Sequence, residues 1–250
     1  MKLVLSPLRL LYKIYFIVIF LISGILLYPF MLFLIRGKNK FRNALRIKQV
    51  WSKAICVLVF IKVQVENADG FPKGVPYVVC ANHASYLDIL LMFLILPDDF
   101  AFLGKAEVLK WPIINVFFLK GIDIPVYRGS VKPVKECLDM ADMALKDGRS
   151  IAIFPEGGME INNDKLRRFK NGAFRLAMDN QVPIVPITFL NNWVLFSDHM
   201  DLFGSGSPGI AKIKIHKAIS PDSESFKDLV SLREKTHKTI KSALEQYGNR

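Results

Sequence analysis

The chain has 250 residues, of which 52% are hydrophobic, and a formal net charge of +12 at pH 7. A chain of this length forms one large domain or a domain with an appendage. A sequence that is both apolar and basic is typical of a protein that lies on an anionic membrane surface and attracts acidic ligands. Nucleic acid is the other common partner of basic chains. The basic residues are not interleaved with aromatic residues as in a nucleic-acid module, which argues against such a partner.

The cysteines and histidines give no sign of a metal site. Three cysteines lie in apolar or helical contexts without C-x-x-C spacing: Cys56, Cys80 and Cys137. This pattern indicates neither a disulfide framework nor a zinc site, and small buried thiols in a reducing compartment are expected instead. The four histidines are scattered along the chain. We therefore expect no metal site.

The N-terminal region contains a long uncharged segment at residues 14–35, IYFIVIFLISGILLYPFMLFLI. As a helix it would span roughly 33 Å, which is enough for the hydrocarbon core of a bilayer. It is too long for the core of a signal peptide, and Arg36-Gly-Lys follows it where a cleavage site would stand. We expect this segment to be embedded in a membrane. Pro29 can kink the helix and turn it back, so crossing and one-sided insertion both stay open.

A second helix is predicted over residues 44–60. Its apolar positions recur at helical spacing: Ile47, Val50, Trp51, Ala54, Ile55 and Leu58. Its polar positions fall largely on the other side: Arg46, Lys48, Gln49, Ser52 and Lys53. This pattern fits a basic helix in the membrane interface, and a helix packed on the protein core is the alternative. Residues 1–60 thus form the predicted membrane anchor. Basic residues are denser after residues 14–35 than before them. If this segment spans the membrane, their distribution would place the rest of the chain in the cytoplasm.

Residues 61–250 alternate between strand-like and helix-like segments. The predicted strands are residues 61–65, 77–81, 100–103, 121–126, 150–154, 184–189 and 211–216. The predicted helices are residues 85–95, 107–119, 131–146, 166–179 and 224–247. This alternation predicts an α/β domain, a mixed sheet flanked by helices. Pro125 and Pro186 lie inside two of the predicted strands and favour sheet edges or interruptions there.

Polar or glycine-rich residues follow three of these strands, where reactive groups collect in α/β sheets. In the first of these segments, Asn82-His83-Ala-Ser-Tyr-Leu-Asp88, the histidine can accept a proton from a hydroxyl. A carboxylate on its other ring nitrogen would fix the tautomer. Since no G-x-S-x-G elbow supplies a nucleophile, such a pair suits transfer of an acyl group from a thioester directly onto an alcohol. The alternative is structural, because Ser85 and Asp88 also have nearly the spacing of a helix capping box.

The other two segments add possible binding groups. Glu156 follows a predicted strand and could hold a hydroxyl group or position a neighbouring base. The glycine pair that starts with Gly157 lets the backbone approach a ligand and present its amides. Arg128 can grip a phosphate with two hydrogen bonds, and Lys105 can add a second positive charge. With His83, these residues predict a site for an anion and a hydroxyl group.

Taken together, the segments resemble the lysophospholipid and glycerolipid acyltransferases, and bacterial 1-acylglycerol-3-phosphate acyltransferases in particular. The resemblance covers nearly everything after residue 76 and follows the family's order. Its blocks are N-H-x4-D at residues 82–88, K-A-E with a later proline, glycine and arginine at residues 105–128, F-P-E-G at residues 154–157, F-K-N-G-A at residues 169–173, and V-P-I-V-P-I at residues 182–187.

The resemblance implies a role for each matching residue. His83 would be the general base on the acceptor hydroxyl and Asp88 its orienting partner. Lys105 and Arg128 would bind the acceptor's phosphate, and Glu156 with Gly157 would shape the acceptor pocket. The donor would be an acyl thioester of coenzyme A or of acyl carrier protein, and no metal or other cofactor would be needed. The product would be phosphatidate, made by a membrane protein whose catalytic domain faces the cytoplasm.

One departure from the family pattern bears on the acceptor. The third block usually reads F-P-E-G-T-R, whereas here Gly158 and Met159 replace the threonine and the arginine. Because that arginine often contacts phosphate, a lysolipid with another head group is an alternative acceptor, and Lys165, Arg167 or Arg168 could supply the missing charge. A lipid-binding protein without turnover and a thioesterase or lipid hydrolase are the competing functions.

Overall fold

The computed structural model describes residues 2–127, 131–159, 166–197, 201, 204–221 and 228–248. The strands of the described chain form one sheet with the order β1-β7-β6-β2-β5-β3-β4. Their bounds are β1 Ile61–Glu66, β2 Val78–Ala81, β3 Phe100–Lys105, β4 Ile124–Val126, β5 Ser150–Ile153, β6 Ile184–Phe189 and β7 Gly209–Ile215. The helices are α1 Lys2–Leu34, α2 Lys40–Leu58, α3 Leu87–Ile95, α4 Asn115–Leu119, α5 Val131–Lys146, α6 Gly172–Asp179, α7 Asn192–Leu195 and α8 Leu229–Gly248, with a 3-10 turn, η1, at Ala106–Lys110.

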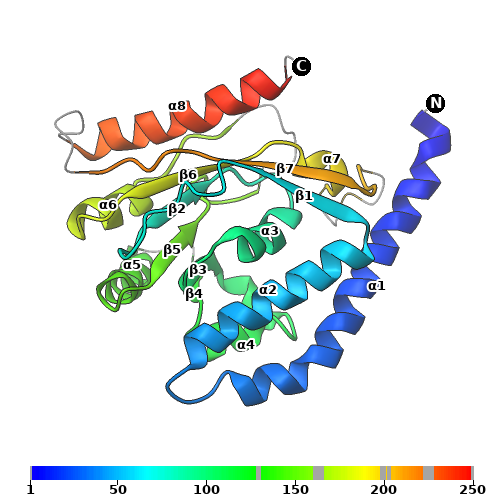
Figure 1. Cartoon of the computed structure of the whole chain (residues 1–250), viewed down its shortest axis with the longest axis horizontal. Coiled ribbons are helices and arrows are strands. Elements are labelled where there is room, and N and C mark those ends of the chain that lie inside the picture. The colour runs from blue at the N-terminus through cyan, green and yellow to red at the C-terminus, as the bar shows by residue number, and fades with distance from the viewer. Residues whose placement is uncertain are drawn as a thin grey trace.

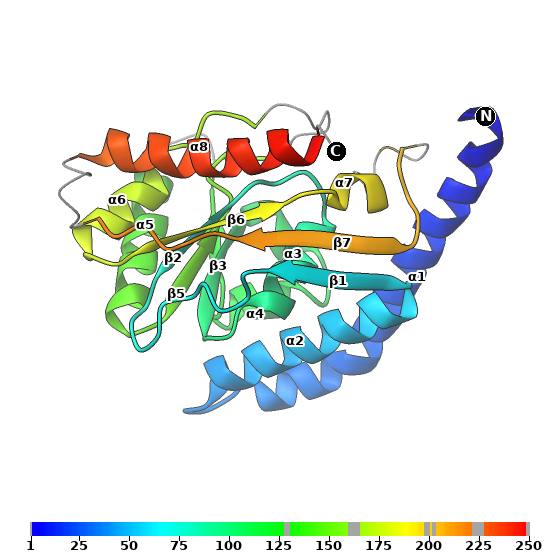
Figure 2. The ribbon, with the colours of Figure 1, turned by 45° about the horizontal axis from the view of Figure 1, so that its top comes forward.

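The sheet is mixed, as predicted. All neighbouring strands pair in parallel except β6 and β7, so β1 and β7 run opposite to the other five. The carboxyl ends of β2, β3, β4, β5 and β6 therefore lie along one edge of the sheet. Figures 1 and 2 show α3, α7 and the N-terminal half of α1 beside this edge.

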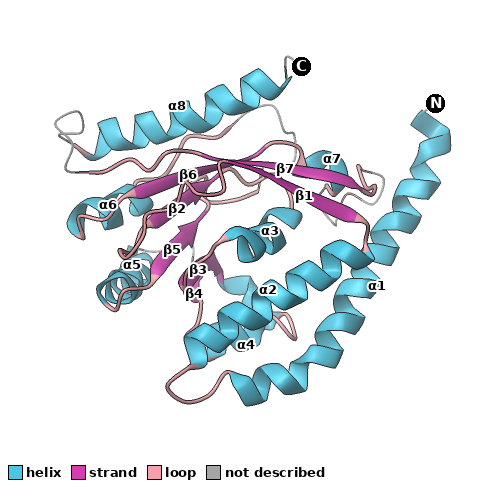
Figure 3. Ribbon diagram, viewed as in Figure 1, coloured by secondary structure: helices cyan, strands magenta, loops and turns pink. Residues whose placement is uncertain are grey.

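Helices cover both faces of the sheet (Figure 3). On one face, residues of β2 such as Cys80 pack with Cys137 of α5, Phe174 of α6 and Ile240 of α8. On the other face, the alternate residue Val79 belongs to a second apolar core with α1 to α4. This division follows from the period of two along a strand, which points successive side chains to opposite faces.

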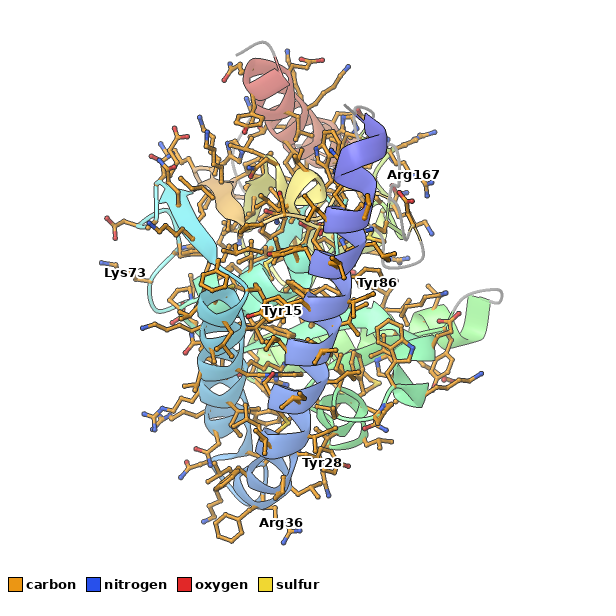
Figure 4. The ribbon with its side chains drawn as sticks, turned by 90° about the vertical axis from the view of Figure 1, so that its right-hand side faces the viewer. Tyr15, Tyr28, Arg36, Lys73, Tyr86 and Arg167 are labelled. Carbon is orange, nitrogen blue, oxygen red and sulfur yellow. The ribbon has the colours of Figure 1, made fainter. Side chains whose placement is uncertain are left out.

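The helices α1 and α2 form a hairpin that packs on the second core. Trp51 of α2 is buried, its ring lies 4.9 Å from that of Phe20, and its Nε1 donates to Ser23 Oγ at 2.9 Å. Gly24 permits the close approach, because a Cβ there would lie 2.9 Å from Ile113. The segment Pro7–Leu34 of α1 is long and apolar enough to cross a membrane. Its outer side chains are exposed, as Figure 4 shows from the side on which α1 lies.

The buried face of α2 differs from the one predicted. Trp51 and Ile55 are buried as expected, but Lys48 and Ser52, expected on the polar side, are buried too, whereas Val50 is 62% exposed. Lys48 can be buried because its ammonium group contacts both carboxylate oxygens of Asp123 at 2.7 Å. Three phenylalanine rings surround this ammonium group: Phe93, Phe100 and Phe117. In the structure α2 is thus a helix packed on the core, which was the alternative prediction.

Pro186 was wrongly expected at a sheet edge or interruption, since β6 lies between β2 and β7. The carbonyl of Pro186 accepts from the amide of His216, on the side of β7. The position of its missing N–H therefore also faces β7, and the pairing of β6 with β7 starts only at the next residue, Ile187. Because a residue's N–H and C=O point to the same neighbouring strand, pairing with β2 loses nothing. Pro125 lies in β4, an edge strand, as predicted.

Two predicted helices are shorter in the structure. The segment 107–119 splits into η1 and α4 at Pro112, and Ile113 has φ +76°. Residues 166–171 are not helical, because their amides are used elsewhere: Arg167 N donates to Glu156 and Lys170 N donates to Pro155 O. Residues 166–171 therefore belong to the connection between β5 and α6, and α6 begins only at Gly172.

Candidate active site

The sheet topology brings the predicted site residues to the carboxyl edge. His83 follows β2, Glu156 follows the neighbouring strand β5, and Lys105 ends β3, the next strand along. Arg128, two residues after the end of β4, lies outside the described residues. The order of the strands is thus the reason why segments far apart in sequence can form one site.

His83 and Asp88 form a hydrogen-bonded pair at the end of β2. His83 Nδ1 lies 3.0 Å from Asp88 Oδ2, and the carboxylate is fully buried while the imidazole is 12% exposed. Because an ionised carboxylate only accepts, the proton of the pair lies on Nδ1. The second ring nitrogen, Nε2, makes no hydrogen bond with the described part of the chain. The imidazole therefore presents a lone pair at a partly open position, as a general base requires.

The ring of His83 is also held by stacking. It lies 3.9 Å from the ring of Phe154, with an angle of 5° between the planes, and Phe102 packs edge-on against Phe154 at 5.4 Å. Phe154 is the first residue after β5, so the two neighbouring strands fix the ring from one side and Asp88 fixes it from another. These contacts restrict rotation of the imidazole.

The capping role predicted for Ser85 and Asp88 coexists with the pair. Asp88 Oδ2 accepts from the amides of Ala84 and Ser85, each at 2.8 Å, and Ser85 Oγ accepts from the amide of Leu87 at 3.0 Å. These contacts satisfy amides that have no partner inside α3. Asp88 thus anchors the start of α3 and the imidazole at once.

A further donor to Asp88 was not predicted from the sequence. Asn192, the first residue of α7, is buried and donates from Nδ2 to Asp88 Oδ1 at 2.7 Å. The signal was present in the pattern, because Asn191 and Asn192 lie two and three residues after the end of β6, and β6 neighbours β2. Applying the strand-end argument to β6 as well would have included this residue.

Glu156 binds backbone and is buried. Its Oε1 accepts from the amide of His83 at 2.8 Å, and its Oε2 accepts from the amide of Arg167 at 3.1 Å. Burial raises the pKa of this carboxyl group from its ordinary 4.5 to about 7, although both amide donors act in the opposite direction. Glu156 therefore ties the ends of β2 and β5 to the loop at residues 166–171.

Gly157 has φ +75°, and its amide donates to Phe154 O at 3.1 Å. This amide therefore closes a turn, whereas the sequence had predicted that it would be presented to a ligand. The side chain of Lys170, which was not among the predicted phosphate-binding residues, fills the space beside Gly157. A Cβ at Gly157 would lie 2.5 Å from the Nζ of Lys170. The exposed ammonium group of Lys170 thus lies against the FPEGGM turn, the segment that lacks the family's arginine.

The remaining basic candidates are less confined. Lys105 is 48% exposed and forms an ion pair with Glu107 at 3.0 Å. Arg167 and Arg168 are exposed on the loop that Glu156 holds, and Lys165 lies outside the described residues. Within the described residues, no group of three or more His, Cys, Asp or Glu side chains could hold a metal ion.

Comparisons with known proteins match this picture. A family model described as Acyltransferase matches residues 62–190. The chain is 31% identical over 200 residues to the 1-acyl-sn-glycerol-3-phosphate acyltransferase alpha of Mus musculus, covering 79% of this chain and 68% of that protein. It is 30% identical over 149 residues to the 1-acyl-sn-glycerol-3-phosphate acyltransferase of Borreliella burgdorferi, covering 60% of this chain and 59% of that protein.

Chloroplast proteins and a solved structure are also similar. The chloroplastic 1-acyl-sn-glycerol-3-phosphate acyltransferase of Arabidopsis thaliana is 30% identical over 206 residues, which are 82% of this chain and 55% of that protein. The chain thus spans little more than half of such relatives. The crystal structure of the 1-acyl-sn-glycerophosphate acyltransferase PlsC of Thermotoga maritima superimposes with a TM-score of 0.78 over 100% of this chain and 99% of that one, at 24% identity. This last match confirms the predicted fold, including its N-terminal helices.

Proposed function

The chain belongs to the acyltransferase family, and from this premise we propose that it is a membrane-bound O-acyltransferase that transfers a fatty acyl group from an acyl thioester to the free hydroxyl of 1-acylglycerol-3-phosphate, forming phosphatidate. The resemblance predicted from the sequence blocks is confirmed at the level of the family. Relatives from an animal, a plant and a bacterium that carry the name of this activity support the choice of acceptor.

The observation that carries the proposal is the buried carboxylate of Asp88 on Nδ1 of His83, with Nε2 left unbonded among the described residues. In the proposed reaction, Nε2 takes the proton of the acceptor hydroxyl while the hydroxyl oxygen attacks the thioester carbonyl carbon. Asp88 holds the ring in the required tautomer and stabilises the imidazolium that forms.

The second half of the reaction returns the proton. As the tetrahedral intermediate collapses, the carbon–sulfur bond breaks and the leaving thiolate takes the proton from Nε2 of His83. The acyl group ends on the acceptor oxygen, the free thiol of coenzyme A or of acyl carrier protein is released, and His83 is neutral again. Each atom of this balance comes from the two substrates and one imidazole, so the proposed reaction uses no metal or cofactor.

We propose that the acceptor's phosphate binds to the basic residues at the same edge of the sheet. Lys105 ends β3 beside the site, and Lys170 lies against the turn at Gly157. The ammonium group of Lys170 supplies positive charge near the position where the family's third block has arginine and this chain has Met159. Arg128 and its phosphate contact stay a prediction. Glu156 and Gly157 shape the pocket indirectly, through the backbone of His83 and the turn.

We propose that the site opens on the side of the molecule where α1 lies. Figure 4 shows α1 with Tyr86, of the segment that carries the pair, and Arg167, of the loop that Glu156 binds, on the same side of the molecule. Phe16 of α1 packs on Phe196, just after α7, with ring centroids 4.2 Å apart. We propose that α1 seats this edge on the bilayer at its cytoplasmic surface, where the acceptor lipid is available.

A lysolipid with another head group is the second candidate acceptor, favoured by Gly158 and Met159 in the third block. The deciding experiment measures thiol release by the detergent-solubilised full chain with an acyl thioester and a panel of lysolipids. The wild type should release thiol fastest with lysophosphatidate, and His83→Ala should release it at the background rate. Faster turnover of a lysolipid without a free phosphate monoester would reassign the acceptor. Release of free fatty acid that does not depend on an acceptor would show a hydrolase, and no turnover would favour a binding protein.

A further inference from the structure

We infer that Asn192 is a positioning residue for the His83–Asp88 pair, supplied by the connection between β6 and β7. This inference rests on the proposed function for its kinetic consequence, whereas its structural consequence can be measured without turnover. Asn192 Nδ2 donates to Asp88 Oδ1 at 2.7 Å, and Asn192 is 1% exposed. It belongs to none of the five sequence blocks, since it lies five residues beyond the last of them, which ends at residue 187.

The two oxygens of Asp88 have separate tasks. Oδ2 accepts from His83 Nδ1 and from two backbone amides, all of them within residues 83–85. Oδ1 accepts from Asn192, which is distant in sequence. Because a carboxylate held at one oxygen alone can still rotate about its Cβ–Cγ bond, the contact at Oδ1 determines the plane of the group. The plane of the carboxylate in turn sets the direction in which Oδ2 meets the imidazole.

The orientation of the Asn192 amide follows from the same contact. An ionised carboxylate accepts but cannot donate, so the amide must turn its nitrogen toward Asp88. Its own oxygen then has no hydrogen-bond partner among the described residues. Burying an unpaired carbonyl oxygen costs stability, and an apolar residue of similar size would avoid that cost. Packing alone therefore does not account for an asparagine at this position, whereas a role toward Asp88 does.

The connection after β6, which carries Asn192, is hydrogen-bonded both to the segment of the His83–Asp88 pair and to helix α1. Phe196 O, one residue after α7, accepts from Ser85 Oγ, next to the pair. The neighbouring Ser197 Oγ accepts from the ammonium group of Lys13 of α1 at 2.6 Å. The connection after β6 is thereby held between the catalytic segment and the N-terminal helix, which gives Asn192 a rigid support for orienting Asp88.

The test uses Asn192→Leu, which keeps the branched shape of the side chain and removes the donor, in the detergent-solubilised full chain. The matched control is Asn191→Ala, because the Asn191 side chain hydrogen-bonds only to backbone among the described residues, accepting from Lys212 N and donating to Ile210 O. We expect Asn192→Leu to lower kcat roughly 10- to 100-fold, as for loss of a hydrogen bond to a charged group, with KM within about twofold. Asn191→Ala should keep the wild-type kcat.

A double-mutant cycle separates positioning from general structural damage. If Asn192 acts through Asp88, Asn192→Leu should lower kcat no further in an Asp88→Asn background. An equal loss of kcat in both backgrounds would overturn the inference, as would a wild-type kcat in the single variant. If Asn192→Leu does not fold, Asn192→Ala takes its place in the same cycle.

A spectroscopic measurement decides the case without turnover. Proton NMR of histidine-labelled protein should show a downfield signal from the His83 Nδ1–H, identified by its absence in His83→Ala. We expect Asn192→Leu to shift this signal upfield or broaden it, and Asn191→Ala to leave it in place. An unchanged signal in Asn192→Leu would contradict the inference. Absence of turnover in the wild type would refute the proposed function and leave this readout intact.

Discussion

Asp88 holds the His83 imidazole with the same carboxylate oxygen that binds the entry of α3. Oδ2 of Asp88 is 3.0 Å from His83 Nδ1 and accepts from two amides that precede the helix. The imidazole and the start of the helix are thus held by one oxygen atom. This arrangement predicts that the two members of the pair respond differently to mutation.

The variant His83→Ala should lose activity and keep its fold. A positioned general base contributes about 10²- to 10⁴-fold to the rate, so we expect kcat to fall by that factor. Asp88 keeps its two amide donors and Asn192 when the ring is removed, so the thermal midpoint should change little. Steady-state kinetics and thermal unfolding of the same preparation check both parts. A folded variant with wild-type kcat would exclude His83 as the base.

The variant Asp88→Asn should lose both activity and stability. Its amide group either presents NH₂ to donors that need an acceptor or holds the imidazole in the wrong tautomer. An unsatisfied buried donor costs about 1–3 kcal/mol, so the free energy of unfolding of Asp88→Asn should fall by about 1–3 kcal/mol. For His83→Ala we expect little change in the free energy of unfolding. Denaturant unfolding of the two variants side by side measures the difference. Equal stabilities would show that the capping role of Asp88 is negligible.

The fold could be predicted from the sequence because its signals are local. Apolar runs bounded by turn residues gave β6 its observed bounds, and the helical period gave α5 its bounds. The helix predicted over residues 166–179 does not form over residues 166–171, because Glu156, ten or more residues away, accepts from the amide of Arg167. Likewise Lys48 is buried because Asp123 is available to it across the fold. A pattern of polar and apolar residues does not reveal tertiary contacts of this kind.

The site was predictable where its residues follow strands and belong to recognisable blocks. His83, Asp88 and Glu156 were predicted in this way and lie together in the structure, although Glu156 holds backbone where a ligand contact was expected. Asn192 was missed because the strand-end argument was not applied to β6. The block that contains Lys170 was recognised, but the position of its ammonium group depends on how the loop returns to the turn at Gly157 and on which strands are neighbours. Strand order is a property of the folded sheet that no single segment encodes.

Lys170 offers a test of phosphate binding that does not involve the base. We expect Lys170→Ala to raise KM for lysophosphatidate about tenfold, equivalent to about 1.4 kcal/mol, with a smaller change in kcat. Arg175→Ala is the matched control, since Arg175 is 71% exposed and pairs with Asp179 on the outer side of α6. Gly157→Ala should have a similar effect on KM, because its Cβ would displace the Lys170 ammonium group and strain a residue at φ +75°. An unchanged KM in Lys170→Ala would remove this lysine from the phosphate site.

The buried pair of Lys48 and Asp123 predicts how the N-terminal hairpin is attached. Removing one partner of a buried ion pair leaves an uncompensated charge and costs about 3–5 kcal/mol. Lys48→Met should therefore destabilise the protein by that amount, because Asp123 stays buried. Lys53→Met, at an exposed position of the same helix, should change the free energy of unfolding by less than about 0.5 kcal/mol. Urea unfolding of both variants tests this, and equal effects would contradict a role for the pair.

Glu156 predicts a specific pH dependence of stability. The pKa of this carboxyl group is about 7 in the folded protein and about 4.5 when the chain is unfolded and solvated. Between these values the folded state binds more protons than the unfolded state, so the free energy of unfolding falls as the pH rises. The shift corresponds to about 3 kcal/mol, which is lost between pH 4.5 and 7 and changes no further above pH 7. Glu156→Gln cannot ionise and should lack this slope.

The measurement is the difference in unfolding free energy between the wild type and Glu156→Gln at several pH values, since other groups titrate alike in both. Activity should show a separate effect. The variant's NH₂ cannot accept from an amide, so either the backbone of His83 or that of Arg167 loses its partner. We expect kcat to fall roughly tenfold, in line with one unsatisfied buried donor. A difference in unfolding free energy that is constant from pH 4.5 to 7 would show that burial does not raise the pKa of Glu156.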